Sequence, residues 1–187
     1  MRKAFVHIGM PKTGTTAVQK AMSNRRVALL HGGLLYPGDN VDHAFLVQNF
    51  HPARGRHFYF KHQKIEPNKA EKIFRKSFHK LEREVAQSDG DVLISTEYLY
   101  NMGEERLRAL RTDLSEMGLD LHVVCYVRHP IGQATSGIQQ NVKMGHDTLA
   151  NQLRNPQWHS CIETLAPALR ALGRSKVTVT PFEFAKE

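Results

Sequence analysis

Short apolar runs alternate along the chain with longer stretches in which hydrophobic and polar residues mix at helical spacing. The apolar runs span only a few residues and are rich in residue types that favour strands. The clearest helical stretch repeats hydrophobic residues every three or four positions, at Ile73, Phe74, Phe78, Leu81 and Val85. The pattern predicts strands at 3–8, 92–95, 121–127 and 177–179, and helices at 15–24, 68–87, 104–117, from 130 onward, and at 163–172.

The order of these elements indicates an α/β fold. Strands separated by helices form parallel sheets with helices on both faces. The run 121–127 is the most continuously apolar, as expected for a strand buried on both sides. Ligands bind beyond the carboxyl ends of such strands. The loop after Ile8, the region around Glu97 and the turn at Arg128 should therefore meet at one edge of the sheet.

Length and composition favour one globular domain over residues 1–187. The chain is 41% hydrophobic and 24% charged, which is ordinary for such a domain. The basic, aromatic segment 51–67 lacks periodicity and is expected to be a long loop or insert, and 155–159 a shorter loop. No apolar run approaches the roughly 18–20 residues of a membrane span. We expect no signal peptide and a cytoplasmic protein.

Cysteine and histidine usage gives no sign of a disulfide framework or a metal site. Cys125 lies inside the run 121–127, so we expect a buried thiol, and Cys161 is the only other cysteine. The eleven histidines are scattered, without the close spacing of metal ligands. No metal cofactor is expected.

The formal net charge of +8 is concentrated in one segment. Between His51 and Lys80 stand nine basic residues against Glu66 and Glu71, namely Arg54, Arg56, Lys61, Lys64, Lys69, Lys72, Arg75, Lys76 and Lys80. The segment either steers an anionic donor or acceptor towards a site or is a solvated helix face. No nucleic-acid-binding motif accompanies the charge, so nucleic acid is not an expected partner.

The turn after the first strand has the composition of an anion-binding loop. It reads Gly9-Met-Pro-Lys-Thr-Gly-Thr-Thr16, and the helix that follows offers backbone amides and its positive end. The spacing from Gly9 to Gly14 matches half of a Walker A loop. The other half fails, because Thr15 and Thr16 stand where an ATPase needs lysine and then serine or threonine. The lysine is instead Lys12, inside the loop.

A second candidate phosphate site follows the strand at 121–127. Arg128 comes at the carboxyl end of that strand, and Pro130 begins the next helix. Arginine suits bidentate contact with phosphate. Ser136 lies about two turns along the helix, so both side chains are candidates for gripping one phosphate group. The alternative is that Arg128 pairs with a carboxylate and Ser136 only packs.

Together these two motifs resemble the signatures of the sulfotransferase superfamily, whose donor is 3′-phosphoadenosine 5′-phosphosulfate (PAPS). Pro11-Lys-Thr-Gly-Thr-Thr16 resembles the 5′-phosphosulfate loop, and Tyr126-Val-Arg-His-Pro130 followed by Ser136 resembles the 3′-phosphate motif. The resemblance implies a three-layer, P-loop-type α/β fold and release of adenosine 3′,5′-bisphosphate. It also implies that the loop holds the 5′ side of PAPS through Pro11, Lys12, Thr13, Gly14, Thr15 and Thr16, and that Arg128 and Ser136 hold the 3′-phosphate.

Sulfuryl transfer to a hydroxyl or amine needs a base, and Glu97 is the leading candidate. It follows a short apolar strand and should reach the same sheet edge as Lys12, the second expected catalytic residue. The resemblance points the same way, since some sulfotransferases acting on carbohydrates use a glutamate here. His129, His43 and His7 are weaker candidates. The alternative is a carboxylate that only caps a helix or pairs with Arg128.

The sequence also departs from the family pattern. Ala17 stands where many relatives carry an aromatic residue that stacks on adenine, and the sequence ends soon after 177–179, as in a truncated chain or a compact variant. Two other functions stay open: a P-loop nucleoside or small-molecule kinase, and a non-catalytic module that binds nucleotides or polyanions. The acceptor is expected to be a small molecule or carbohydrate, with the basic segment hinting at an anionic one. The oligomeric state is not predicted.

Overall fold

A five-stranded, all-parallel sheet forms the centre of the computed structural model, which describes residues 1–156 and 160–186. The strand order is β2-β3-β1-β4-β5. The strands are β1 (Arg2–His7), β2 (Leu34–Leu35), β3 (Asp91–Ser95), β4 (Leu119–Val127) and β5 (Val177–Pro181). The expected α/β class is confirmed, and β2 is an additional strand that the hydrophobic pattern did not predict.

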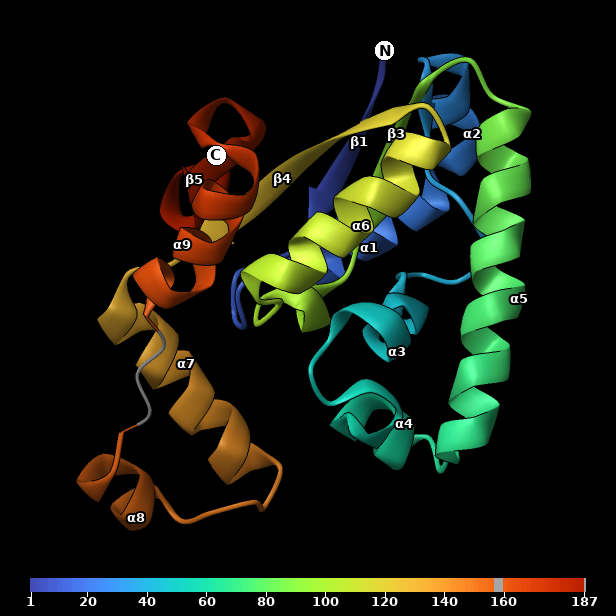
Figure 1. The fold of residues 1–187 in the computed structure, drawn as a ribbon. Helices are drawn as coiled ribbons and strands as arrows, with labels where there is room; N and C mark the ends of the chain where they lie inside the picture. Colours follow the sequence, from blue (N-terminus) through green and yellow to red (C-terminus); the bar gives the residue numbers. More distant parts are fainter. Residues whose placement is uncertain (157–159, 187) are drawn as a thin grey trace.

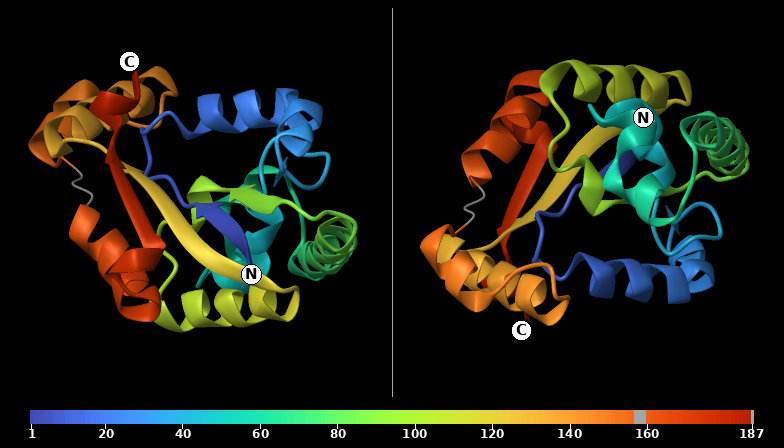
Figure 2. Two further views of the ribbon diagram at one scale, coloured as in Figure 1. Left: turned by 90° about the horizontal axis from the view of Figure 1, so that it is seen from above. Right: turned by 90° about the horizontal axis from the view of Figure 1, so that it is seen from below.

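Helices cover both faces of the sheet, which makes three layers (Figures 1 and 2). One face carries α6 and α9, which contact each other and β4. The other face carries α1 and α2, with α7 and α8 towards the β5 edge and α5 alongside the β2 edge. The helices are α1 (Thr15–Asn24), α2 (Arg26–His31), α3 (Val47–Phe50), α4 (Phe58–His62), α5 (Pro67–Ala86), α6 (Glu104–Glu116), α7 (Pro130–Lys143), α8 (Leu149–Arg154) and α9 (Cys161–Leu172).

The core joins β1, β3 and β4 to the inner faces of α5, α6 and α9. Residues at alternate positions of β4 are buried, including Leu121, Val123 and Cys125, so the expectation of a buried Cys125 thiol is confirmed. Burial raises the pKa of this thiol to about 12. The stripe predicted on α5 packs inward through Phe74, Leu81 and Val85.

The segment 51–67 is not the long loop that the sequence indicated. It contains a 3₁₀ turn at Arg54–Arg56 and the helix α4, and Phe60 of α4 is fully buried against Val47 and Ala70. The aromatic residues of this segment do not follow helical spacing, but the buried ring of Phe60 holds the segment against the rest of the protein. The loop expected at 155–159 falls largely outside the described residues, which stop at 156 and resume at 160.

None of the helices in the described ranges is long and apolar enough to cross a membrane.

Candidate functional site

The loop between β1 and α1 lies at the carboxyl edge of the sheet, between its two neighbouring strands. The amide of Ile8 donates to Val124 O of β4 at 3.0 Å, and the amide of Thr96, after β3, donates to His7 O at 3.0 Å. The loop then turns through left-handed backbone at Lys12 (φ 69°) and Gly14 (φ 72°). A non-glycine residue held in this region is uncommon and often marks a functional turn.

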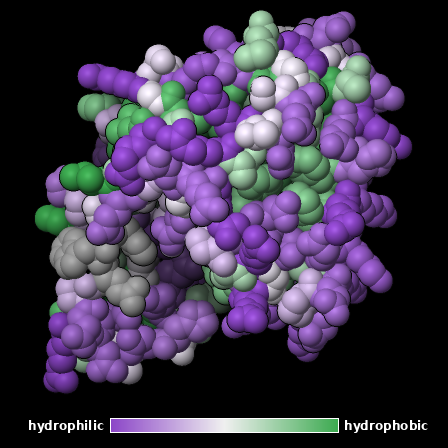
Figure 3. All heavy atoms as spheres, in the orientation of Figure 1, coloured by the Kyte–Doolittle hydropathy of each residue, from purple (hydrophilic) through white to green (hydrophobic). Residues whose placement is uncertain are grey.

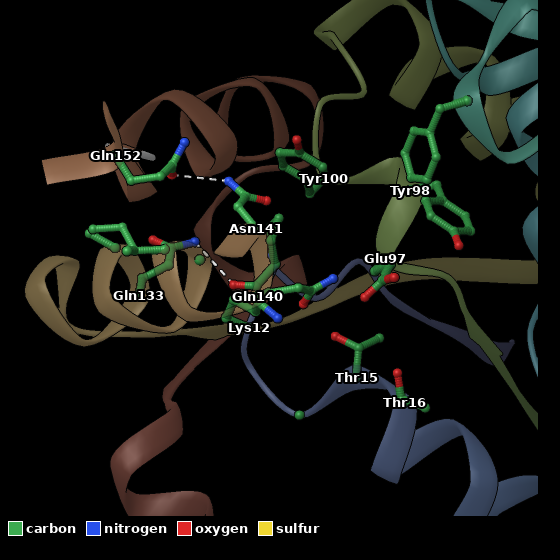
Figure 4. A pocket seen from close by; sticks show the side chains of 16 residues that line it. Lys12, Thr15, Thr16, Glu97, Tyr98, Tyr100, Gln133, Gln140, Asn141 and Gln152 are labelled. Carbon is green, nitrogen blue, oxygen red and sulfur yellow. Dashed lines mark hydrogen bonds between the residues drawn. The ribbon is translucent and has the colours of Figure 1, made fainter. Parts of the chain in front are cut away.

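A cavity of about 520 Å³ opens above this loop, within the usual size range of small-molecule sites. The loop forms its floor, α7 and α8 one wall, and the segment after β3 the opposite wall (Figure 4). Figure 3 shows a hollow on the same side of the molecule, between α7–α8 and the remaining structure, bordered by hydrophilic side chains. The lining residues are Pro11, Lys12, Gly14, Thr15, Thr16, Phe58, Glu97, Tyr98, Tyr100, Gln133, Ala134, Gly137, Ile138, Gln140, Asn141 and Gln152.

Lys12 and Glu97 project into this cavity from different strand ends (Figure 4). Glu97 begins the 3₁₀ turn Glu97–Leu99 directly after β3. Burial raises the pKa of its carboxyl group, the charge of Asp42 raises it further, and the charge of Lys12 lowers it. A carboxylate with a raised pKa accepts a proton more readily than an exposed one, which suits a general base.

Thr15 and Thr16 stand at the start of α1, where the first backbone amides have no partner within the helix. The Thr15 side chain is only 3% exposed, and its hydroxyl has no hydrogen-bond partner. A buried, unpaired hydroxyl is costly unless a ligand completes it. An anion at the end of α1 would satisfy both the amides and this hydroxyl.

Thr13 does not face the cavity. Its side chain is buried, and its hydroxyl donates to Met10 O at 2.6 Å, so it closes the loop on itself. Of the six loop residues expected to bind the donor, the other five line the cavity.

Arg128 supports the loop from the side of β5. Its Nη1 donates to Lys12 O at 2.9 Å, and its guanidinium group lies over the Phe182 ring at 5.3 Å. Among the described residues no carboxylate is hydrogen-bonded to Arg128, and neither Arg128 nor Ser136 lines the cavity. Gly132 lies beside the Arg128 side chain, since a Cβ atom there would lie 3.3 Å from Arg128 Nε, and Ser136 follows one turn later on α7.

The histidines considered as alternative bases lie elsewhere. His7 and His43 are buried, and burial lowers the pKa of each to about 4. His7 Nδ1 is 2.8 Å from Ser95 Oγ, while His43 accepts from the Ser95 amide and donates to Pro37 O. His129 is exposed at the start of α7. None of the three lines the cavity.

Several cavity residues were not predicted from the sequence. Amide side chains of α7 and α8 form one wall, where Asn141 Nδ2 donates to Gln152 Oε1 at 3.1 Å and Gln133 Nε2 donates to Pro11 O at 3.1 Å (Figure 4). The cavity positions Gln133, Gly137, Gln140 and Asn141 follow helical spacing on α7, and three of them carry amide side chains, a signal that the sequence does contain. Tyr98, Tyr100 and Phe58 complete the opposite wall.

The basic residues of the segment from His51 to Lys80 do not reach the cavity, although Phe58 of the same segment lines it. Lys80 is partly exposed, the other eight Lys and Arg residues are exposed, and none of the nine lines the site. Lys80 pairs with Asp39 and Glu84.

The chain is an α/β protein in which Lys12 and Glu97 line one cavity at the carboxyl edge of a parallel sheet. No protein-family model matches the chain, and no curated protein matches it either. In the described ranges no cluster of His, Cys, Asp and Glu is arranged to hold a metal ion.

Proposed function

We propose that this protein is a sulfotransferase that moves the sulfuryl group of PAPS to a hydroxyl or amine acceptor. The observation that carries the proposal is that Lys12 and Glu97 share one cavity, above the amino end of α1 and the unpaired Thr15 hydroxyl. A cation, an anion-binding helix end and a base are the groups that sulfuryl transfer requires.

In this proposal the loop holds the 5′-phosphate and Lys12 stabilises the leaving group. The amides at the start of α1, with Thr15 and Thr16, bind the phosphate oxygens. Lys12 donates to the oxygen that bridges phosphorus and sulfur. When the bond from sulfur to this oxygen breaks, the electron pair stays on the oxygen, and Lys12 stabilises the new charge.

Glu97 accepts the proton of the acceptor while the acceptor's oxygen or nitrogen forms its bond to sulfur. The products are the sulfated acceptor and adenosine 3′,5′-bisphosphate. As in phosphoryl transfer, most of the rate comes from positioning and electrostatics. The raised pKa of Glu97 supports the role of base.

Arg128 and Ser136 are proposed to bind the 3′-phosphate. Arg128 uses Nη1 to hold Lys12 O, and a guanidinium group has further N–H donors. Gly132 lets the backbone of α7 lie close to the Arg128 side chain. One arginine would then couple the loop that binds the 5′ end to the site that binds the 3′ end.

The central test replaces Lys12 by alanine. With labelled PAPS and a panel of hydroxyl and amine acceptors, we expect Lys12→Ala to lower kcat on the order of 10²–10³-fold. Lys64→Ala is the matched control, because Lys64 is also a lysine with positive φ (54°) but lies outside the cavity. Unchanged transfer in Lys12→Ala would reject the proposed role of this residue.

Calorimetry separates the proposal from the two alternatives. A sulfotransferase should bind adenosine 3′,5′-bisphosphate more tightly than ATP, with or without Mg²⁺. Magnesium-dependent ATP turnover would favour the kinase. Binding of the bisphosphate or of a heparin-like polymer without transfer to any acceptor would favour the binding module.

A further inference from the structure

A second cavity of about 530 Å³ adjoins the first and shares Phe58 and Tyr98 with it. Its other walls come from the segment before α3 and from α4, including Asp42, Tyr59 and His62. A molecule whose reacting group lies beside Glu97 would therefore extend past Phe58 and Tyr98 towards Asp42.

Asp42 gives this second cavity an uncompensated negative charge. Its carboxylate accepts a hydrogen bond from the Ala44 amide at 3.2 Å, and no ion pair joins it to a basic residue of the described chain. No lysine or arginine is among the residues that line the cavity. Arg26 donates instead to Ser23 and to Asn40 O.

The electrostatic effect of Asp42 extends to the shared wall. Its charge contributes to the raised pKa values of Tyr59, Tyr98 and Glu97, after the larger effect of burial. Burial also raises the pKa of Asp42 itself. A cation bound beside Asp42 would favour the charged forms of Asp42, Tyr59, Tyr98 and Glu97 and so lower the pKa of each.

The aromatic rings beside Asp42 suit such a cation. The Tyr98 ring lies 5.3 Å from Phe58 and 5.4 Å from Tyr59, so three rings border the passage between the cavities. Aromatic faces combined with a carboxylate are the usual surroundings of ammonium ligands.

We propose that the second cavity binds an ammonium group of the acceptor, held by Asp42 among Phe58, Tyr59 and Tyr98, while a hydroxyl of the same molecule reaches Glu97. This rests on the proposed function. The hydroxyl proton passes to Glu97, its oxygen forms the bond to sulfur, and the ammonium group is unchanged. The acceptor class is then an amino alcohol or amino sugar rather than the anionic molecule that the net charge indicated.

Two probes of nearly equal shape test the charge preference. Choline carries a quaternary ammonium group and one hydroxyl, and 3,3-dimethylbutan-1-ol replaces the nitrogen by carbon. With PAPS as donor, we expect kcat/KM for choline to exceed that of the neutral alcohol by about tenfold or more. Asp42→Asn, which keeps an acceptor for the Ala44 amide, should bring the ratio close to one. Asp39→Asn is the control, because Asp39 is exposed and lies outside both cavities.

Binding is measured separately, so that failure of the inference differs from failure of the proposed function. In an NMR titration, choline should shift the backbone amides of Asp42, Tyr59 and Tyr98 at lower concentration than the neutral alcohol does, and Asp42→Asn should remove the difference. Equal binding of the two probes, or a choline preference that survives in Asp42→Asn, overturns the inference even if PAPS is a donor. Choline binding that depends on Asp42, without sulfation of any acceptor, supports the cavity assignment and rejects the sulfotransferase.

Discussion

At the scale of single residues, Glu97 experiences opposing electrostatic effects. Burial and the neighbouring Asp42 favour its protonated form, and Lys12 favours the carboxylate. Because its folded pKa is raised, the stability that this group contributes is present at low pH and is lost as pH rises through that pKa. At neutral pH the charged form of Glu97 therefore destabilises the folded protein.

Replacing this carboxylate should separate activity from stability. We expect Glu97→Gln to lower kcat by about 10²–10⁴-fold and to raise the free energy of unfolding by about 0.5–1 kcal/mol at pH 7. Urea unfolding and the PAPS assay measure the two effects.

Glu104→Gln is the matched control for this variant. Glu104 is paired with Arg108 and Arg170, which lower its pKa, so its replacement should slightly decrease stability and leave transfer unchanged. A loss of stability in Glu97→Gln, or retained activity, would contradict our reading of Glu97.

The sequence predicted that Lys12 and Glu97 lie at the same sheet edge, because each stands in the segment that follows a strand, and both line the cavity there. It could not show that Thr13 turns back to Met10 O, since that depends on the left-handed turn at Lys12. Asp42 was missed for a different reason. It comes from a segment without periodicity, and only the three-dimensional fold brings it near Glu97.

At the scale of elements, the β1–α1 loop is restricted by a ring that packs on its glycine. A Cβ atom on Gly14 would lie 2.8 Å from Phe182 Cε2, and the residue has a positive φ of 72°. Gly33 has a similar φ of 80°, but a Cβ atom there would meet no neighbour within 4 Å. Alanine substitutions at the two positions therefore separate the cost of backbone strain from the cost of steric crowding.

We expect Gly33→Ala to cost about 1–2 kcal/mol of stability, from the left-handed backbone alone. Gly14→Ala should cost about 1–3 kcal/mol more, because Phe182 must move, and it should also weaken binding of adenosine 3′,5′-bisphosphate. Chemical denaturation and calorimetry check both effects. Equal costs at the two positions would show that Phe182 does not constrain the loop.

Elements with a strong local pattern were predicted to within one or two residues. α1 and α6 are examples. α6 has Glu104 and Glu105 in its first turn and ends shortly before Gly118, which has a positive φ. β2 was not predicted, since its two residues are a strand only through parallel pairing with β3. α2 and α8 are six residues each, too short for periodicity to reveal them.

At the scale of the whole molecule, buried neutral histidines should set the acid limit of stability. His7 and His43 have pKa values lowered to about 4 by burial, against 6.5 when unfolded. Their stabilising contribution is present above pH 6.5 and is lost as pH falls towards 4. Each group should account for a loss on the order of 3 kcal/mol across this range.

Urea unfolding at several pH values tests this. The free energy of unfolding of the wild type should fall between about pH 6.5 and 4. In His43→Gln it should fall less steeply, because unfolding then takes up about one proton fewer. Identical pH profiles for the two proteins would mean that His43 does not titrate on unfolding.

The net charge indicated an anionic acceptor, whereas the acceptor that we propose carries an ammonium group. Most of the basic excess lies on exposed side chains of α5 and the segment before it, and Figure 3 shows the outer side of α5 as hydrophilic. Composition sums charge over the chain, whereas recognition depends on the few groups that face a cavity.

Phe182 packs against Gly14 and Arg128, and so joins the β1–α1 loop to a part of the chain that the ribosome synthesises much later. During synthesis the loop emerges well before the ring that packs on it, because more than a hundred and fifty residues separate Gly14 from Phe182. A nascent chain would therefore carry the loop's full sequence without its finished shape. In the proposed function, a chain stalled before β5 would therefore bind the nucleotide more weakly than the finished protein.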